Sequence, residues 1–401
     1  MKTSHSDLRT ELGLRALINA SGTMTTLGAS MMVPEAIEAM AAIAPHFVEM
    51  EELHKKACAV VAKATGGEAG TITASTAAGI AHAIAGCMTG SDLGRIEQLP
   101  DCSDMKDEVV VQLGHMVDFG HPIDQDIRIT GAKVRLVGHA TETRIHQLEH
   151  ALGTNTAAAL YVVSHHTARF GMIDLKTFCE ICHANDVPVI VDAASEYDLK
   201  KFLRDGADLV IYSGHKFLGG PTSGIVAGNK NLVRAAYLQN FGIGRPMKVG
   251  KESICGVMAA IEAWGHRDHE GIRAREQEIL SLWYEGLREV PGLDVRMDPD
   301  PTRNPIQRVH VQLDSEVTRI SAWELARRLA QGSTPVIVRG EYLGSGAFEL
   351  DACNQKLGQP EVLLSRIHEE LEKAREQNEM TDGSFSDERR RQTTQMLSWP
   401  D

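Results

Sequence analysis

The sequence has few features of a membrane-bound, secreted or nucleic-acid-binding protein. It has no run of roughly 18 apolar residues that would span a bilayer, and its start has no apolar segment with a small-residue cleavage site. Lys and Arg number 41 against 54 Asp and Glu, for a net charge of −13, and the one basic run lies at 389–391. We therefore expect a cytoplasmic protein that binds neither membranes nor nucleic acid.

Cysteine is also scarce, and its distribution argues against a disulfide framework. The seven cysteines are an odd number scattered over 401 residues, as is typical of thiols in a reducing compartment. Cys179, Cys182 and His183 match the haem-attachment spacing C-x-x-C-H, but the segment around them predicts a helix leading into a buried strand. Because no further ligands for a metal accompany this pair, we expect no metal site.

The chain from 49 to 265 predicts one large α/β domain. Amphipathic helices alternate with short apolar strands bounded by Gly, Asp and Asn, which is typical of a mostly parallel, buried sheet. The strands are expected at 108–113, 133–138, 158–163, 187–195, 207–214 and 223–228. The stretch 73–88 is interpreted as a small-residue turn that opens a helix.

Three further segments flank this domain. Residues 1–48 are expected to form an arm that contributes to the active site, and 266–380 a smaller α+β domain entered through one long helix at 253–290. Residues 381–401 are polar and predict a tail.

Lys216 ends an apolar run and precedes a cluster of glycines, which raises the question of its role. Most lysines at strand ends extend to the surface and cover apolar neighbours with their stems. A desolvated lysine, however, has a lowered pKa and can condense with an aldehyde cofactor. Pyridoxal 5'-phosphate (PLP) would need, besides this lysine, a phosphate cradle, an acid for its ring nitrogen, a flat partner for its ring and a cation for the substrate.

Candidates for the acid and the cradle follow two predicted strands. Asp192 ends the strand at 187–192, where ligands of open α/β sheets bind, although it could equally cap the next segment. Ser75, Thr76, Ala77 and Ala78 begin a helix whose free N–H groups can bind a phosphate, and Ser213 can add a hydroxyl.

The remaining roles have weaker candidates. His115 follows a strand and can lie against the cofactor ring, although lone histidines are more often structural. Arg339 interrupts an apolar run and can hold a substrate carboxylate with two hydrogen bonds. Asn19, Ser21 and Thr23 lie in a polar stretch that is either a simple loop or a source of donors for a hydroxylated ligand.

Four segments together resemble fold-type I PLP enzymes, in particular the selenocysteine synthase-like branch that includes D-glucosaminate-6-phosphate ammonia-lyases. They are "INASGT", "TGGEAGTITASTAAGIAHAIAGCMTG", "PVIVDAASE" and "YSGHKFLGGPTSGIVAG", and they lie between residues 17 and 260. In the last third of the chain the resemblance rests on "VIVRG". The order of these segments is specific for the cofactor and less specific for the reaction.

The resemblance implies a fold with a seven-stranded-type sheet, and it implies PLP bound to Lys216 as a Schiff base. It also implies Asp192 at the pyridine nitrogen, residues 75–78 with Ser213 at the phosphate, His115 on the ring, and a homodimer or larger assembly. The acidic chain departs from the tRNA-binding members. His215 has no role assigned by the resemblance; it could tune the Schiff base, carry a proton or merely pack.

We therefore expect a PLP-dependent lyase with a small-molecule substrate. The favoured reaction is an α,β-elimination that converts a hydroxylated amino acid or amino sugar acid, such as D-glucosaminate or its 6-phosphate, to a 2-keto acid and ammonia. Racemisation, aldol cleavage, transamination and, less favoured, a tRNA-dependent transfer use the same residues. A substrate phosphate could bind Lys55, Lys56, Arg169, Lys248 or Lys251.

Overall fold

The computed structural model describes residues 7–332, 334–377, 380 and 382–400. Contacts divide the chain into two units. Met31–Arg267 form the first, which we call the sheet unit. The described residues up to Ser30 pack with the described residues from Asp268 onward, and we call them together the C-terminal unit.

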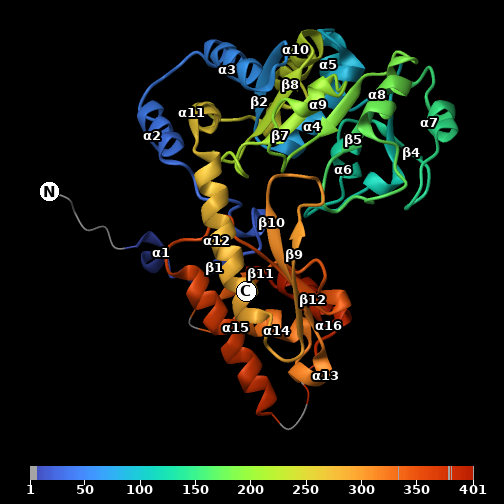
Figure 1. The fold of residues 1–401 in the computed structure, drawn as a ribbon. Helices are drawn as coiled ribbons and strands as arrows, with labels where there is room; N and C mark the ends of the chain where they lie inside the picture. Colours follow the sequence, from blue (N-terminus) through green and yellow to red (C-terminus); the bar gives the residue numbers. More distant parts are fainter. Residues whose placement is uncertain (1–6, 333, 378–379, 381, 401) are drawn as a thin grey trace. The chain divides into compact units, whose positions relative to one another are not determined.

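A seven-stranded sheet forms the centre of the sheet unit, in the order β2-β8-β7-β6-β5-β3-β4 (Figure 1). Its strands are β2 (Ala69–Thr73), β3 (Glu108–Gln112), β4 (Lys133–Val137), β5 (Thr156–Val162), β6 (Val189–Asp192), β7 (Leu209–Ser213) and β8 (Gly224–Gly228). Neighbours from β4 to β7 pair in parallel, and β8 is antiparallel to β7 and β2. The predicted mostly parallel α/β fold is confirmed.

The prediction missed β2, which was not among the expected strands. Its five residues are small or β-branched and all are buried, so it has no alternation of apolar and polar residues. The strand is recognisable only through its antiparallel pairing with β8.

Helices cover both faces of this sheet. The side chains of β3 point alternately to the two faces and are buried on both, so each face needs a cover. Val110 packs in one apolar cluster with α3 (Met50–Thr65), α7 (Ile145–Ala151), α8 (Leu175–His183) and α11 (Lys251–His266). Val109 and Val111 pack in the other with α4 (Thr76–Thr89), α6 (Asp124–Arg128) and α10 (Lys230–Leu238). The unit also contains α2 (Pro34–Ile43), α5 (Leu93–Gln98) and α9 (Lys201–Arg204).

The C-terminal unit is built on a three-stranded antiparallel sheet of β9 (Leu293–Pro299), β10 (Gln307–Leu313) and β12 (Ala347–Asp351), in the order β12-β10-β9. Its helices are α1 (Leu8–Glu11), α12 (His269–Leu287), α13 (Ser315–Thr318), α14 (Ala322–Leu329), α15 (Gln359–Arg375) and α16 (Phe385–Leu397). A core around the fully buried Trp283 and Phe348 joins the sheet to α12, α14 and α15. Among the described residues, no helix of either unit is both long and apolar enough to cross a membrane.

Three segments differ from the expectation. The helix expected at 253–290 is two helices, because the chain breaks at Arg267 and Asp268 caps α12 by accepting a hydrogen bond from the Gly271 N–H (2.9 Å). Part of the expected N-terminal arm, β1 (Ile18–Ala20), pairs in parallel with β11 (Val336–Val338). Much of the expected tail is α16, which Ser384 caps and which buries no residue.

Candidate active site

Most of the predicted cofactor-binding residues lie at one edge of the sheet unit. Because β3, β6 and β7 run in parallel, their carboxyl ends meet at the same edge. His115 ends the short 3-10 helix Leu113–His115 that follows β3, Asp192 ends β6 and Ser213 ends β7. Lys216 follows Ser213 after a short turn.

Lys216 and the loop after Asp192 are in direct contact. The Nζ of Lys216 donates a hydrogen bond of 2.6 Å to the Oγ of Ser195, three residues beyond Asp192. Lys216 is half-buried. The sequence prediction did not include Ser195, although a hydroxyl just after a buried strand was a usable signal.

Asp192 is a buried carboxyl group with a raised pKa, as expected for a site that binds a cationic group. Burial raises its pKa to about 6, and the charge of Lys216 and a hydrogen bond from the Ala194 N–H (3.1 Å) limit this rise. The negative charge of Asp126 adds to the rise. A protonated pyridine nitrogen would supply the compensating charge.

The start of α4 offers an anion-binding site. The Oγ of Ser75 caps the helix by accepting a hydrogen bond from the Ala78 N–H (3.0 Å). In an α-helix, the N–H groups of Thr76 and Ala77 have no acceptor within the helix and can bind a phosphate. On β8, a Cβ at Gly224 would lie 2.2 Å from the carbonyl oxygen of Ser75, so this approach requires glycine.

Ser213 and His215 interact with each other next to the lysine. The Oγ of Ser213 lies 3.2 Å from the Nδ1 of His215. Burial and the neighbouring Lys216 lower the pKa of His215, which favours a neutral imidazole. The hydroxyl predicted to bind the phosphate is therefore oriented by the histidine whose role was left open.

His115 is a neutral, fixed imidazole. Its Nδ1 accepts a hydrogen bond from the Val162 N–H (3.2 Å), so the proton of the neutral ring is on Nε2. Burial lowers the pKa of His115 to about 4, and the ring packs edge-on against Tyr161 at 4.5 Å between centroids. A flat, uncharged ring suits the predicted contact with an aromatic cofactor.

Arg267 braces the turn that follows Lys216. Its guanidinium donates hydrogen bonds to the carbonyl oxygens of Phe217 (2.9 Å) and Leu218 (2.8 Å) and lies over the ring of Trp264. The Tyr197 ring contacts both Phe217 and Trp264, at 4.1 and 5.2 Å between centroids. The loop after β6 and the loop after β7 are thus held in one cluster.

We predict that Arg267→Ala weakens cofactor binding by about tenfold, since the loss of two charge-assisted hydrogen bonds frees the turn that carries Lys216. Fluorescence titration of the cofactor-free protein measures this. Arg288→Ala is the matched control, because Arg288 also lies over an aromatic ring, that of Tyr284. Arg288 pairs with Glu285 and is far along the chain from the Lys216 turn. Equal affinities for the two variants would contradict the prediction.

In the C-terminal unit, Asn19 and Ser21 use their donors within their own turn. The Nδ2 of Asn19 donates to the carbonyl oxygen of Gly22 (2.8 Å), and its Oδ1 accepts from the N–H and the hydroxyl of Ser21 (both 2.9 Å). The expected roles of Asn19, Ser21 and the half-buried Thr23 as donors to a ligand stay predictions.

The turn also approaches Arg339. Nη1 of this buried arginine donates to the carbonyl oxygen of Ser21 (3.2 Å), and the guanidinium pairs with Glu341 (2.7 Å) and Glu349 (3.4 Å). A substrate carboxylate would have to compete with these two acids. The assignment of Arg339 to the substrate stays a prediction.

We predict that Gly22→Ala destabilises the C-terminal unit by about 1–3 kcal/mol. Gly22 has a φ of +88°, and a Cβ there would lie 2.9 Å from Oδ2 of the buried Asp351. Gly28→Ala is the control, because its φ of +86° is similar and its Cβ would meet no atom within 4 Å. Urea unfolding should give the larger loss for Gly22→Ala; equal losses would mean that the close approach to Asp351 does not matter.

Two of the residues proposed for a substrate phosphate are already engaged. Lys251 donates to the carbonyl oxygen of Ala44 (2.8 Å) and pairs with Glu252 (2.6 Å). Lys55 pairs with Glu51 (2.8 Å) on the exposed side of α3. Lys56, Arg169 and Lys248 are exposed, and their role stays a prediction.

A family model described as "SelA: L-seryl-tRNA selenium transferase" matches residues 17–321. The chain belongs to this family. The resemblance derived from the four sequence segments is confirmed, and the matched range includes every predicted site residue except Arg339.

Two curated relatives of this SelA-family chain have similar identities and different names. A D-glucosaminate-6-phosphate ammonia lyase from Salmonella typhimurium is 36% identical over 91% of this chain and 98% of the relative. A 5'-C-glycyluridine monooxygenase-decarboxylase from Streptomyces is 35% identical over 92% of this chain and 94% of the relative. Among solved structures, a D-glucosaminate-6-phosphate ammonia-lyase superposes with a TM-score of 0.82 and 36% identity, covering 92% of this chain and 99% of the other.

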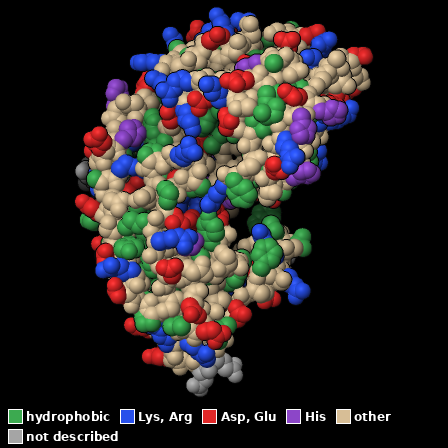
Figure 2. Space-filling model, turned by 45° about the vertical axis from the view of Figure 1, so that its right-hand side comes forward, with side chains coloured by type: hydrophobic (Ala, Val, Ile, Leu, Met, Phe, Trp, Pro, Cys, Tyr) green, Lys and Arg blue, Asp and Glu red, His purple; other side chains and the backbone are tan. Residues whose placement is uncertain are grey.

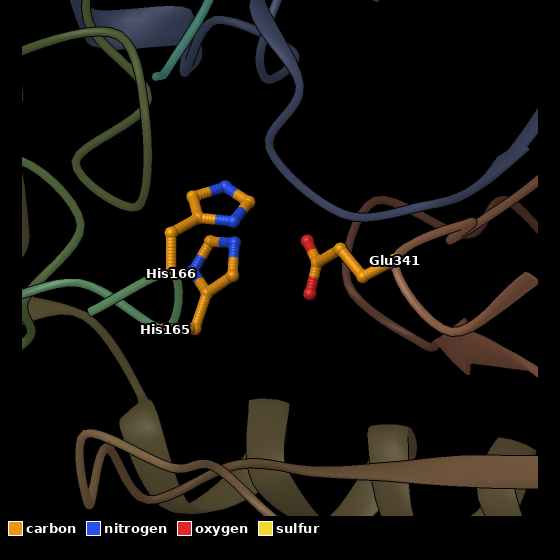
Figure 3. A group of neighbouring side chains, drawn as sticks. All are labelled: His165, His166 and Glu341. Atoms are coloured by element: carbon orange, nitrogen blue, oxygen red, sulfur yellow. The ribbon is translucent and has the colours of Figure 1, made fainter. Parts of the chain in front are cut away.

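The sheet edge of this SelA-family member carries two more histidines that the sequence prediction missed. His165 and His166 follow β5, and their rings lie next to each other with centroids 3.9 Å apart (Figure 3). They follow a buried strand as His115 does, so the signal that identified His115 would have identified them. They are additional candidates for substrate or proton contacts.

Proposed function

We propose that this chain is a PLP-dependent ammonia-lyase that acts on a hydroxylated amino acid or amino sugar acid, such as D-glucosaminate or its 6-phosphate. The observation that carries the proposal is the arrangement of Lys216, Ser195 and the buried Asp192 at one sheet edge. The similarity to a D-glucosaminate-6-phosphate ammonia lyase over most of both chains supports the reaction type.

The residues of the sheet unit fit the cofactor. Lys216 would hold it, and Asp192 would keep its ring nitrogen protonated. The N-terminus of α4 and Ser213 would bind its phosphate, and His115 would lie against its ring. When bound, PLP withdraws electrons from the α-carbon of an amino acid, which makes the α-proton acidic.

The chain's own groups then move the protons. The Nζ of Lys216, held by the hydroxyl of Ser195, takes the α-proton. The electrons of the broken C–H bond form a C=C bond, and the β-hydroxyl leaves with a proton delivered by the same Nζ, as water. The released unsaturated amine takes up one water and loses ammonia, so that the products are a 2-keto acid and ammonia.

The remaining assignments are part of the same proposal. Arg339 would hold the substrate carboxylate by exchanging Glu341 for it, and Thr23 and exposed basic residues would contact its other polar groups. We also propose that the protein is a cytoplasmic homodimer or larger homo-oligomer.

The decisive test is an assay of the purified protein. Its visible absorption should be that of a bound PLP and should disappear on treatment with borohydride. D-glucosaminate 6-phosphate, D-glucosaminate and a panel of β-hydroxy amino acids should include at least one substrate that yields keto acid and ammonia in equal amounts. A colourless protein would contradict the cofactor, and a coloured protein without ammonia release would contradict the lyase.

The second curated relative supplies an alternative reaction. Because a monooxygenase-decarboxylase is almost as similar as the ammonia lyase, the assay should also record oxygen uptake and carbon dioxide release. Oxygen uptake coupled to product would favour this alternative. Retention of the α-carboxylate and equal rates with and without oxygen would favour the lyase.

A tRNA substrate is disfavoured by the charge of the chain. The net charge is −13, and on the face drawn in Figure 2 the Lys and Arg side chains are interspersed with Asp and Glu side chains. A protein that binds the phosphates of a tRNA normally has its basic residues concentrated in a patch on one face. We expect no retardation of tRNA in gel-shift titrations at physiological salt.

A further inference from the structure

The sheet of the C-terminal unit has one apolar and one charged face. Val309, Val311, Phe348 and Leu350 point to one side and belong to the core of the unit. His310 lies between Val309 and Val311 in sequence, so it points to the opposite face. Across the strands it is paired with Glu349 and with Arg296. Asp298 is two residues from Arg296 and shares this second face.

His310 is the unusual member of the charged face. Its side chain is 5% exposed, and its Nδ1 has no hydrogen-bond partner. Two carboxylate oxygens flank this nitrogen, Oδ2 of Asp298 at 3.7 Å and Oε1 of Glu349 at 3.8 Å. Both distances exceed the ~3.2 Å limit of a good N–H···O hydrogen bond, so the three atoms converge without bonding to one another.

We propose that His310, Asp298 and Glu349 are the protein ligands of a divalent transition-metal ion. The three ligand atoms all lie within 4.8 Å of one another. An ion about 2.0–2.2 Å from each of them would separate tetrahedral ligands by roughly 3.3–3.6 Å. The two distances from Nδ1, 3.7 and 3.8 Å, are slightly longer, so binding would draw the ligands together by a few tenths of an ångström. This site departs from the sequence expectation of no metal, because ligands on three different strands leave no spacing motif.

The charges around this site favour a cation. Five carboxylates and three guanidiniums gather there: Asp298, Asp300, Glu341, Glu349 and Asp351 with Arg296, Arg308 and Arg339. These groups carry five formal negative charges and three positive ones, and an excess of negative charge is costly in a partly buried cluster. A divalent ion offsets that excess.

Neighbouring groups hold the ligands as an outer layer of a metal site does. Arg296 donates to both oxygens of Asp298 at 2.9 and 3.1 Å, and Arg339 pairs with the Oε2 of Glu349. The ring of Tyr342 stands edge-on to His310 at 5.3 Å between centroids. In this arrangement Oε1 of Glu349 lies 3.8 Å from Nδ1 of His310, which has no hydrogen-bond partner.

The donor set selects the kind of ion. One imidazole and two carboxylates suit Zn²⁺ or a similar first-row ion better than Mg²⁺, which prefers oxygen ligands alone and retains its waters. Three protein ligands leave a fourth position for water. We therefore use Zn²⁺ as the probe and Mg²⁺ as the comparison.

Calorimetric titration of the full chain, after dialysis against a chelator, tests the proposal. We expect one zinc site per chain that is lost or weakened at least 10- to 100-fold in His310→Gln and in Glu349→Gln, while Mg²⁺ binds far more weakly. His183→Gln is the matched control, since His183 also lies beside a carboxylate, Asp208 at 2.8 Å, outside the cluster. This control should bind zinc as the unaltered chain does.

Asp298→Asn is the ligand variant that is expected to disturb folding least, because the side chain of Asp298 is 31% exposed. It should keep the unfolding temperature of the metal-free chain and still lose zinc affinity. Absence of zinc binding, or zinc binding that is unchanged in His310→Gln, Glu349→Gln and Asp298→Asn, would overturn the proposal.

Discussion

Lys216→Ala is expected to lower turnover by at least about 10⁴-fold and to abolish the borohydride-sensitive visible absorption. The proposed function gives the Nζ of Lys216 two tasks, holding the cofactor and moving the α-proton, and a positioned acid–base group alone contributes about 10²–10⁴-fold. Lys216→Arg should be equally inactive. It keeps a positive charge near Asp192 but cannot release a proton at neutral pH.

Lys230→Ala is the control for this prediction. Lys230 follows β8 as Lys216 follows β7, yet β8 is antiparallel to β7, so Lys230 lies at the opposite edge of the sheet, and it is exposed. Its replacement should change turnover less than twofold to threefold and leave the visible spectrum intact. An active, coloured Lys216→Ala protein would refute both the cofactor and the lyase.

The parallel part of the sheet could be predicted from sequence because its strands are apolar, β-branched runs ended by polar or glycine residues. β3, β6 and β7 have this character, and each contributes a predicted residue at its carboxyl end. β9, in contrast, was missed although Leu293, Val295 and Met297 alternate with charged residues, a pattern that is typical of a half-buried strand. Its antiparallel pairing with β10 places it in the sheet.

The site was predictable where one residue follows one strand, and unpredictable where a contact joins distant segments. Ser195 meets Lys216 only because β6 and β7 are neighbours. Arg267 braces the Lys216 turn from the end of α11 through 2.9 and 2.8 Å hydrogen bonds that span 50 and 49 residues of sequence. The role of Asn19 stays a prediction, because a polar loop residue has the same local pattern whether it binds a ligand or its own turn.

Asp192→Asn is expected to change activity and stability in opposite directions. In the loaded enzyme the amide cannot hold a proton on the cofactor ring through a charge, so turnover should fall by about 10²–10³-fold. In the cofactor-free protein, burial has raised the pKa of Asp192 from 3.8 to about 6, so folding favours the protonated carboxyl. The ionised carboxylate therefore destabilises the empty protein at neutral pH.

The sign and pH window of this effect follow from linkage. Between pH 3.8 and about 6 the folded state binds more protons than the unfolded state, so the stability of the cofactor-free protein falls as the pH rises through this range. Above pH 6 the loss in the free energy of unfolding of the cofactor-free protein reaches about 3 kcal/mol. Cofactor-free Asp192→Asn should thus be more stable than the unaltered protein at pH 8, and its advantage should shrink towards pH 4.

Denaturant unfolding of both cofactor-free proteins at pH 8 and pH 4 measures this difference in stability. Asp174→Asn is the contrasting variant, because Asp174 is an exposed helix cap whose replacement should lower stability at pH 8. If Asp192→Asn also loses stability at pH 8, Asp192 is a structural carboxylate with its partners in place, and its assignment to the cofactor ring fails.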